Sequence, residues 1–229
     1  DSNAPGLQFD RILADVPCSG DGTLRKNADL WRKWHTGLGI GMHALQLRIS
    51  LQCCRMLKVG GKMVYSTCSL NPMEDESVIA ELIRLCEGSL EIVPQEGVLP
   101  DLKRMPGMTT WKVQDKFGWK TEINQEGVQQ AHNLLPSMFP HPDNNKIGLE
   151  HCMRFLPHHA DTGGFFVVVL RKTAELPESI HPRKKTKADT KVEEEQPNKR
   201  QKTEDGYVAS EGAGEEQKAG AEGGEAAGA

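Results

Sequence analysis

Two cysteines and one aspartate stand where two apolar segments of this 229-residue chain give way to polar turns. Cys18 follows residues 9–15, which end in Asp15, and Cys68 follows residues 62–67. A thiolate is the reactive form of cysteine, and a carboxylate beside two thiols can orient a substrate or move a proton. The pattern predicts a nucleophile site of these three residues, although a cysteine can equally be a small buried apolar residue.

The segments that carry these residues predict an α/β fold. Residues 9–15 and 62–67 are apolar enough for buried strands, and residues 43–57 between them have the apolar spacing of a helix, which Gly60-Gly61 should end. A strand–helix–strand connection is almost always right-handed, so the two strands should be parallel and close together. Ligands of open α/β sheets bind outside the carboxyl ends of the strands, where the thiols and the carboxylate should converge.

Further elements extend this pattern into a mainly parallel sheet. Pro72 and the acidic residues 74–76 suit the start of a second helix. Residues 90–93 and 165–171 predict two more strands, whereas residues 94–150 are rich in Pro and Gly and predict loops and short helices.

The remaining cysteines and a histidine cluster predict no metal site. His151, Cys152, His158 and His159 follow none of the spacings common in structural zinc sites. The six cysteines also lack the paired spacing of small secreted domains, which favours reduced thiols. Three of them lie on predicted helix faces and should simply pack in the core: Cys53, Cys54 and Cys86.

Composition divides the chain into a domain at residues 1–172 and a tail at residues 173–229. The tail holds nine basic and thirteen acidic residues, which is the whole net charge of −4, and it contains no Phe, Trp, Met or Cys. Such a segment cannot bury enough apolar surface to fold, so we expect it to be disordered, with a Gly/Ala/Glu-rich end over residues 206–229.

Two basic clusters in the tail, Arg183–Lys187 and Lys199–Lys202, are spaced like a bipartite nuclear import signal. The interpretation competes with an ordinary solvated charge run. It predicts nuclear import receptors as partners and a location in the nucleus or nucleolus. No apolar run reaches the roughly 20 residues of a membrane helix, so no membrane partner is expected.

Three short motifs carry a family resemblance: Asp15-Val-Pro-Cys-Ser-Gly20, Tyr65-Ser-Thr-Cys-Ser69 and Asn71-Pro-Met-Glu74. In this order they resemble the Sun family of RNA (cytosine-5)-methyltransferases, and most of all its eukaryotic tRNA-modifying members. The resemblance covers roughly residues 9–172. It implies the C-terminal half of a Rossmann-like domain that uses S-adenosylmethionine as cofactor, within a longer enzyme that methylates tRNA and other RNA.

The resemblance also implies a role for each site residue. Cys68 would be the nucleophile that adds to carbon 6 of cytosine, and Cys18 would help to remove the proton from carbon 5. Asp15 would lie near the base and be the one cofactor contact carried over. The DNA enzymes of this chemistry use a Pro-Cys thiol, which would point to Cys18 instead; the motif Thr67-Cys68-Ser69 favours the RNA type.

Basic residues near the first thiol predict contact with RNA. Residues 11–62 hold nine Lys and Arg against three Asp and Glu. Arg25 and Lys26 follow the Cys18 turn, where a phosphate backbone would approach a base held at the thiols. The nearby tryptophans could stack on bases or anchor the core.

The Gly-rich cofactor loop of similar enzymes is not found before residue 9. Gly37-Leu-Gly-Ile-Gly41 imitates such a loop, but no strand leads into it, and we expect a mobile connection there. The chain alone is therefore expected to be inactive. The alternative is a noncatalytic RNA-binding or interaction fragment that has lost cofactor binding.

Overall fold

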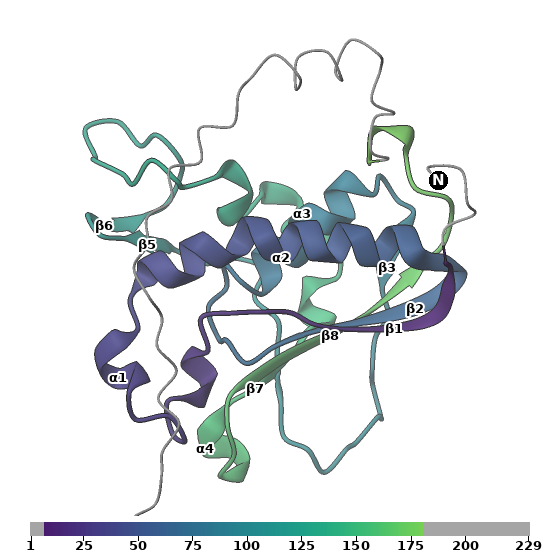
Figure 1. The fold of residues 1–229 in the computed structure, drawn as a ribbon, viewed down its shortest axis with the longest axis horizontal. Coiled ribbons are helices and arrows are strands. Elements are labelled where there is room, and N and C mark those ends of the chain that lie inside the picture. Colours follow the sequence, from purple (N-terminus) through teal and green to yellow (C-terminus); the bar gives the residue numbers. More distant parts are fainter. Residues whose placement is uncertain (1–6, 181–229) are drawn as a thin grey trace, which may run out of the picture. The chain divides into compact units, whose positions relative to one another are not determined.

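The computed structural model describes residues 7–180, which form one mixed β-sheet with helices packed against it (Figure 1). The strands of this sheet run in the order β1-β2-β8-β7-β4, β3 pairs with β8, and β5 and β6 form a separate hairpin. The strands are β1 (Phe9–Asp15), β2 (Leu57–Thr67), β3 (Leu90–Ile92), β4 (Met105–Pro106), β5 (Val113–Asp115), β6 (Gly118–Lys120), β7 (Met153–Phe155) and β8 (Phe165–Lys172).

Two long helices and several short ones connect these strands. The α-helices are α1 (Leu30–Lys33), α2 (Thr36–Met56), α3 (Glu76–Leu85) and α4 (Pro157–Ala160). The 3-10 turns are η1 (Asp21–Thr23), η2 (Pro136–Met138), η3 (Pro142–Lys146), η4 (Leu149–His151) and η5 (Glu178–Ile180). None of the helices between residues 7 and 180 is long and apolar enough to cross a bilayer.

The predicted α/β class and the pairing of the first two strands are confirmed. β1 and β2 are parallel neighbours joined through α2, and Asp15 lies opposite Ser66. The prediction of a mainly parallel sheet was wrong, because every other strand pair of this sheet in the described residues is antiparallel. The long excursion between β3 and β7 contains no crossover helix, so the chain returns through β7 and reverses into β8.

The core lies between the sheet and the two long helices. Figure 1 shows α2 running along one side of the sheet with α3 beside it. Met63 and Tyr65 of β2, and Phe166 and Val168 of β8, are fully buried. The alternate residues of the strands are more exposed, and Leu13 of β1 keeps 73% of its surface accessible. This alternation is the two-residue period of a sheet with one well-covered face.

Gly60 and Gly61 do not end the helix between β1 and β2, as the sequence had indicated. α2 ends at Met56, and the fully buried Leu57 already belongs to β2. The glycines lie inside β2, where the register with β1 shifts between Phe9 and Arg11. Gly60 has a φ of 82°, so the pair permits an irregularity that a side chain would resist.

The glycines of residues 37–41 are neither a cofactor loop nor a mobile connection; they form the first turns of α2. A Cβ on Gly39 would lie 2.2 Å from Nδ2 of Asn71. Glycine in a helix costs about 1 kcal/mol relative to alanine. Close packing of the Asn71 side chain against the helix explains why Gly39 stands there.

The packed chain extends beyond the predicted boundary at residue 172. Leu176 and Ile180 are buried, and Nε of Arg55 donates a 3.0 Å hydrogen bond to the carbonyl oxygen of Ile180. The rest of the predicted tail, with both basic clusters, lies outside the described residues.

Candidate active site

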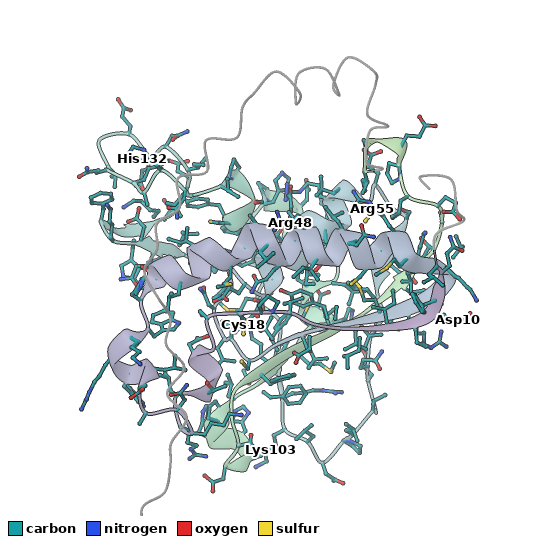
Figure 2. All side chains as sticks on the ribbon, in the orientation of Figure 1. Asp10, Cys18, Arg48, Arg55, Lys103 and His132 are labelled. Carbon is teal, nitrogen blue, oxygen red and sulfur yellow. The ribbon has the colours of Figure 1, made fainter. Side chains whose placement is uncertain are left out.

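The two thiols that follow β1 and β2 meet at the carboxyl edge of the sheet. The Sγ atoms of Cys18 and Cys68 lie 3.3 Å apart, and both residues are half-buried. Figure 2 shows Cys18 on the segment that leaves β1. The parallel pairing of the two strands accounts for this encounter, because it brings both strand ends to one edge.

The pKa values of the two thiols shift in opposite directions, which favours a proton on Cys18 rather than on Cys68. A hydrogen bond from Cys18 lowers the pKa of Cys68 from 9.0 to about 7, although partial burial opposes this. The same hydrogen bond, together with burial and the charge on Cys68, raises the pKa of Cys18 far above its ordinary value. The arrangement therefore favours ionisation of Cys68 over ionisation of Cys18 near neutral pH.

Asp15 lies at the same edge and its carboxylate faces solvent. Ser66, opposite it on β2, donates a 2.8 Å hydrogen bond to Oδ1 of Asp15. The negative charge of Asp15 raises the pKa of Cys68, but less than Cys18 lowers it. Asp15 is thus an exposed acceptor beside the thiols and could hold a donor group of a cofactor or a base.

Gly22 fixes the loop of Cys18 against the turn of Cys68, and sequence reasoning gave it no role. Its N–H donates to the carbonyl oxygen of Cys68 (2.9 Å), and its own carbonyl accepts from the N–H of Gly164 (2.7 Å). A Cβ on Gly22 would lie 2.6 Å from the carbonyl oxygens of both Cys68 and Gly164. Only glycine permits this approach, so Gly22 positions the two thiols relative to each other.

A buried carboxylate behind the thiols joins the two loops and also escaped prediction. Glu74 is fully buried before the start of α3, and its oxygens face five donor groups. These donors are Ser19 N at 2.7 Å, Ser19 Oγ at 2.5 Å, Gln46 Nε2 at 3.2 Å, Ser69 Oγ at 3.0 Å and Asn71 Nδ2 at 3.3 Å. In the sequence, Glu74 was marked only by its place in the motif Asn71-Pro-Met-Glu74. The acidic residues 74–76 by themselves had indicated a helix start and no buried carboxylate.

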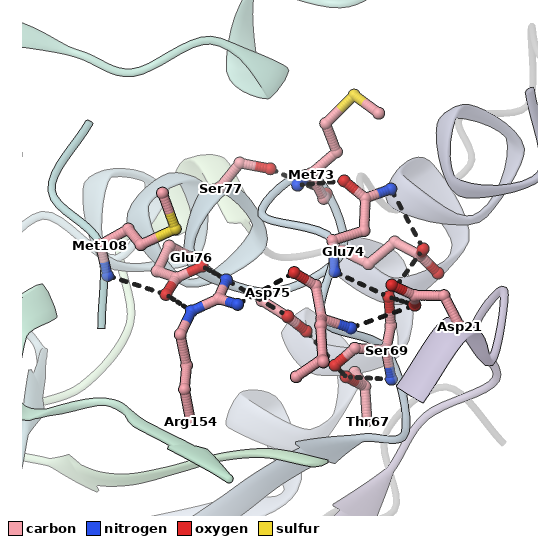
Figure 3. Close-up of polar contacts among 12 residues, drawn as sticks. Asp21, Thr67, Ser69, Met73, Glu74, Asp75, Glu76, Ser77, Met108 and Arg154 are labelled. Carbon is pink, nitrogen blue, oxygen red and sulfur yellow. Dashed lines mark hydrogen bonds and ion pairs between the residues drawn. The ribbon is translucent and has the colours of Figure 1, made fainter. Parts of the chain in front are cut away.

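The next two acidic residues form a second buried network (Figure 3). Arg154 of β7 forms a bidentate ion pair with Glu76 and donates a 2.9 Å hydrogen bond to the carbonyl oxygen of Leu70. Asp75 accepts from Oγ1 of Thr67 at 2.7 Å and lies 3.5 Å from Arg154. Burial and the neighbouring Glu76 raise the pKa of Asp75, against the opposing charge of Arg154.

The residues predicted to bind RNA are exposed near the thiols. Arg25 forms an ion pair with Asp161 at 2.5 Å, with 49% of its side chain accessible. Lys26 is exposed, and its charge is among the causes that lower the pKa of Cys68. Trp34 donates a 3.0 Å hydrogen bond to Oγ of Ser19 and is anchored, whereas Trp31 is 72% exposed.

Between residues 7 and 180, no three His, Cys, Asp or Glu side chains gather closely enough to hold a metal ion. Cys152 is buried and burial raises its pKa well above the ordinary value, which disfavours a thiolate ligand.

Known proteins are similar to this chain over much of its length. Residues 1–99 match the family described as 16S rRNA methyltransferase RsmB/F. The chain is 49% identical over 179 residues to a tRNA (cytosine(34)-C(5))-methyltransferase of Drosophila melanogaster, covering 74% of this chain and 23% of that protein. It is 45% identical to the multisite-specific tRNA:(cytosine-C(5))-methyltransferase trm4b of Schizosaccharomyces pombe, covering 87% of this chain and 29% of the other.

Among solved structures, a methyltransferase homologue from Pyrococcus horikoshii is 26% identical, with a TM-score of 0.45, over 72% of this chain and 40% of that one. The chain thus spans only about a quarter of the length of the two curated relatives.

Proposed function

We propose that this chain, whose residues 1–99 match the RsmB/F family of methyltransferases, carries the catalytic thiols of an RNA (cytosine-5)-methyltransferase that acts on tRNA. The observation that supports the proposal most is the 3.3 Å contact between the thiols of Cys18 and Cys68 at the carboxyl edge of the sheet. The reaction needs one thiolate and one proton carrier beside the same base, and the opposite pKa shifts provide both.

Cys68 is the nucleophile. Carbon 5 of cytosine is a weak nucleophile, and addition of a thiolate to carbon 6 makes it enamine-like. The sulfur of Cys68 forms the bond to carbon 6, and the electron pair of the ring double bond moves to carbon 5. S-adenosylmethionine, when bound, supplies the methyl group that carbon 5 receives. Loss of the proton from carbon 5 then re-forms the double bond and expels the thiolate of Cys68.

Cys18 manages protons in this scheme. Before attack it holds its proton and stabilises the thiolate of Cys68. Once Cys68 is bonded to carbon, its negative charge is gone, and two of the causes that raise the pKa of Cys18 disappear with it. Cys18 can then lose its proton to solvent and take the proton from carbon 5.

Asp15 is the residue of this chain that would hold cofactor and base. Its carboxylate is exposed at the strand end, which fits a role in accepting hydrogen bonds from amino groups. One carboxylate is too few contacts to bind a cofactor tightly, and the chain spans about a quarter of its relatives. We therefore place the activity in a longer protein that contains this sequence, with Arg25 and Lys26 on the RNA backbone.

The test traps the covalent adduct. The complete protein containing this sequence is incubated with S-adenosylmethionine and tRNA in which 5-fluorocytosine replaces cytosine, so that no proton can leave carbon 5. We expect a denaturation-resistant protein–RNA band whose crosslinked peptide contains Cys68, and no band with Cys68→Ala.

With ordinary tRNA, Cys18→Ala should accumulate adduct, because attack survives while release fails, and Cys152→Ala is the matched thiol control. A band that persists in Cys68→Ala and vanishes in Cys18→Ala would reverse the two roles. RNA binding without any adduct would favour the noncatalytic RNA-binding alternative.

The basic clusters Arg183–Lys187 and Lys199–Lys202 support a nuclear location as a further proposal. A fluorescent reporter fused to residues 177–205 should enter the nucleus. It should stay cytoplasmic when Lys184, Lys185, Lys199 and Arg200 are replaced by Ala. An unchanged distribution would contradict the proposal.

A further inference from the structure

A pocket beside the thiol loops has no part in the scheme above. It lies between the start of α2, the turn at Asn71 and the β5–β6 hairpin, and its volume is about 420 Å³. Figure 1 shows this hairpin beside the first turns of α2. The volume falls within the roughly 300–1,000 Å³ typical of small-ligand sites.

Three of the four tryptophans of the chain line this pocket: Trp34, Trp111 and Trp119. Two of them are fixed by hydrogen bonds of their indole N–H groups, Trp34 to Ser19 and Trp111 to the carbonyl oxygen of Met138 at 2.8 Å. Trp119 differs, because 63% of its surface is exposed. Flat aromatic walls of this kind stack on nucleobases whatever their sequence.

Buried polar contacts tie together the hairpin that carries Trp119. Lys120, the next residue, is buried and lies 3.3 Å from the equally buried Asp115 on the opposite strand. Asp115 also accepts hydrogen bonds from the N–H groups of Phe117 and Ala131, both at 2.8 Å. These contacts join the two strands of the hairpin to each other and to the segment at Ala131, next to the exposed Trp119 that lines the pocket.

The polar residues of the pocket connect it to the thiols. Oδ1 of Asp21 accepts from Ser69 Oγ at 2.6 Å and from the N–H of Leu70 at 3.0 Å, immediately after Cys68. Both of these hydrogen bonds end on Oδ1 of Asp21. Among the described residues 7–180, its other oxygen, Oδ2, is therefore an available acceptor. Lys112 lines the same pocket and is exposed, where a phosphate could lie.

We propose that this pocket binds the nucleotide next to the reacting cytosine, and that it takes a base that carries an amino group. The proposal rests on the proposed function. The base stacks on Trp119, its amino group donates to Oδ2 of Asp21, and its phosphate lies near Lys112. Uracil has no amino group and would be taken less well.

The experiment uses the full chain and short single-stranded RNAs. Each RNA has one cytosine followed or preceded by 2-aminopurine, a fluorescent amino-bearing base whose emission falls when it stacks. We expect quenching on binding, and a dissociation constant about 5- to 100-fold weaker for Trp119→Ala, as for loss of one base–aromatic stack. Phe9→Ala removes an exposed aromatic ring at the start of β1, outside the pocket, and should change neither readout.

Two further arms exclude a merely structural effect. Trp119→Phe should restore most of the affinity, and an RNA with an abasic site in place of 2-aminopurine should bind wild type and Trp119→Ala equally weakly. Replacing 2-aminopurine by uracil should weaken binding to the wild type but not to Asp21→Asn. Equal affinity of Trp119→Ala and Phe9→Ala, tight binding of the abasic RNA, or no RNA binding by this chain would overturn the proposal, since every wall of the pocket belongs to this chain.

These outcomes are independent of the covalent test. Adduct formation at Cys68 with no effect of Trp119 would reject the pocket alone. Quenching that depends on Trp119, without any adduct at Cys68 in the complete protein, would reject the proposed reaction alone.

Discussion

Two pairs of cysteines in this chain share one electronic arrangement and differ in everything else. In each pair the neighbouring thiol raises one pKa and lowers the other: Cys18 and Cys68 at the sheet edge, and Cys54 of α2 with Cys86 after α3. The first pair is half-buried, whereas the second is fully buried. A lowered thiol pKa is therefore not enough to mark a reactive site, because access decides whether a substrate can meet the sulfur.

The surroundings of the two pairs explain the difference in access. Cys54 lies in α2 and Cys86 directly follows α3, and packing encloses both. Cys18 and Cys68 stand in polar loops after strands, which the buried Glu74 joins through Ser19 and Ser69. Arg154, paired with Glu76, adds a hydrogen bond to the carbonyl oxygen of Leu70. These hydrogen bonds hold the two loops in place at the surface, so the thiols stay accessible in a fixed arrangement.

Alkylation should separate the two pairs most strongly. Iodoacetamide at pH 7 should modify Cys68 roughly 1000-fold faster than Cys86. A buried thiol reacts only when the surrounding structure opens, and that opening costs a large part of the free energy of unfolding, which is about 5 kcal/mol or more. Mass spectrometry of the two peptides measures both rates, and the same reaction in urea should equalise them. Comparable rates in the folded protein would show that Cys86 is accessible and end the comparison.

Loss of the network behind the exposed pair should cost stability. Glu76→Gln removes the bidentate partner of the buried Arg154 and leaves it only the more distant Asp75, so we expect the free energy of unfolding to fall by about 3–5 kcal/mol. Glu81→Gln breaks the more exposed pair with Arg84 on the same helix, and should cost at most about 1 kcal/mol. Urea unfolding measures both, and equal losses would mean that the buried network has no special weight.

The smallest effect concerns the hydrogen bond between the exposed thiols. Cys18→Ala removes the main cause of the lowered pKa of Cys68, so that pKa should rise from about 7 toward 9.0. The thiolate fraction at pH 7 falls, while the intrinsic nucleophilicity of the thiolate rises with its pKa, so alkylation should slow only about 5- to 8-fold. Alkylation rates from pH 6 to 10 give the pKa, with Cys54→Ala as control. An unchanged midpoint would remove Cys18 as the proton donor.

The sequence alone determined the first strand and the equivalent positions of the two thiols after their strands. The strand at Phe9–Asp15 was predicted with its observed bounds, since a short apolar run that ends in a polar turn has few other solutions. Strand ends and a crossover helix also sufficed to bring Cys18 and Cys68 to one edge, because the handedness of that connection is nearly invariant. The order of the motifs then suggested the reaction that is proposed for the two thiols.

Only the tertiary structure decided the rest, because it depends on residues distant in sequence. Glycine is needed at position 22 because its backbone pairs closely with Gly164. The charge of Glu76 is neutralised by Arg154, which lies 78 residues away in sequence on β7. Neither partner has a local signal in hydropathy or spacing. The glycines of residues 37–41 were misinterpreted for the same reason: their helix is fixed by packing against Asn71, which outweighs the intrinsic preference of glycine. Periodicity records which face a segment buries, whereas only the fold determines what that face meets.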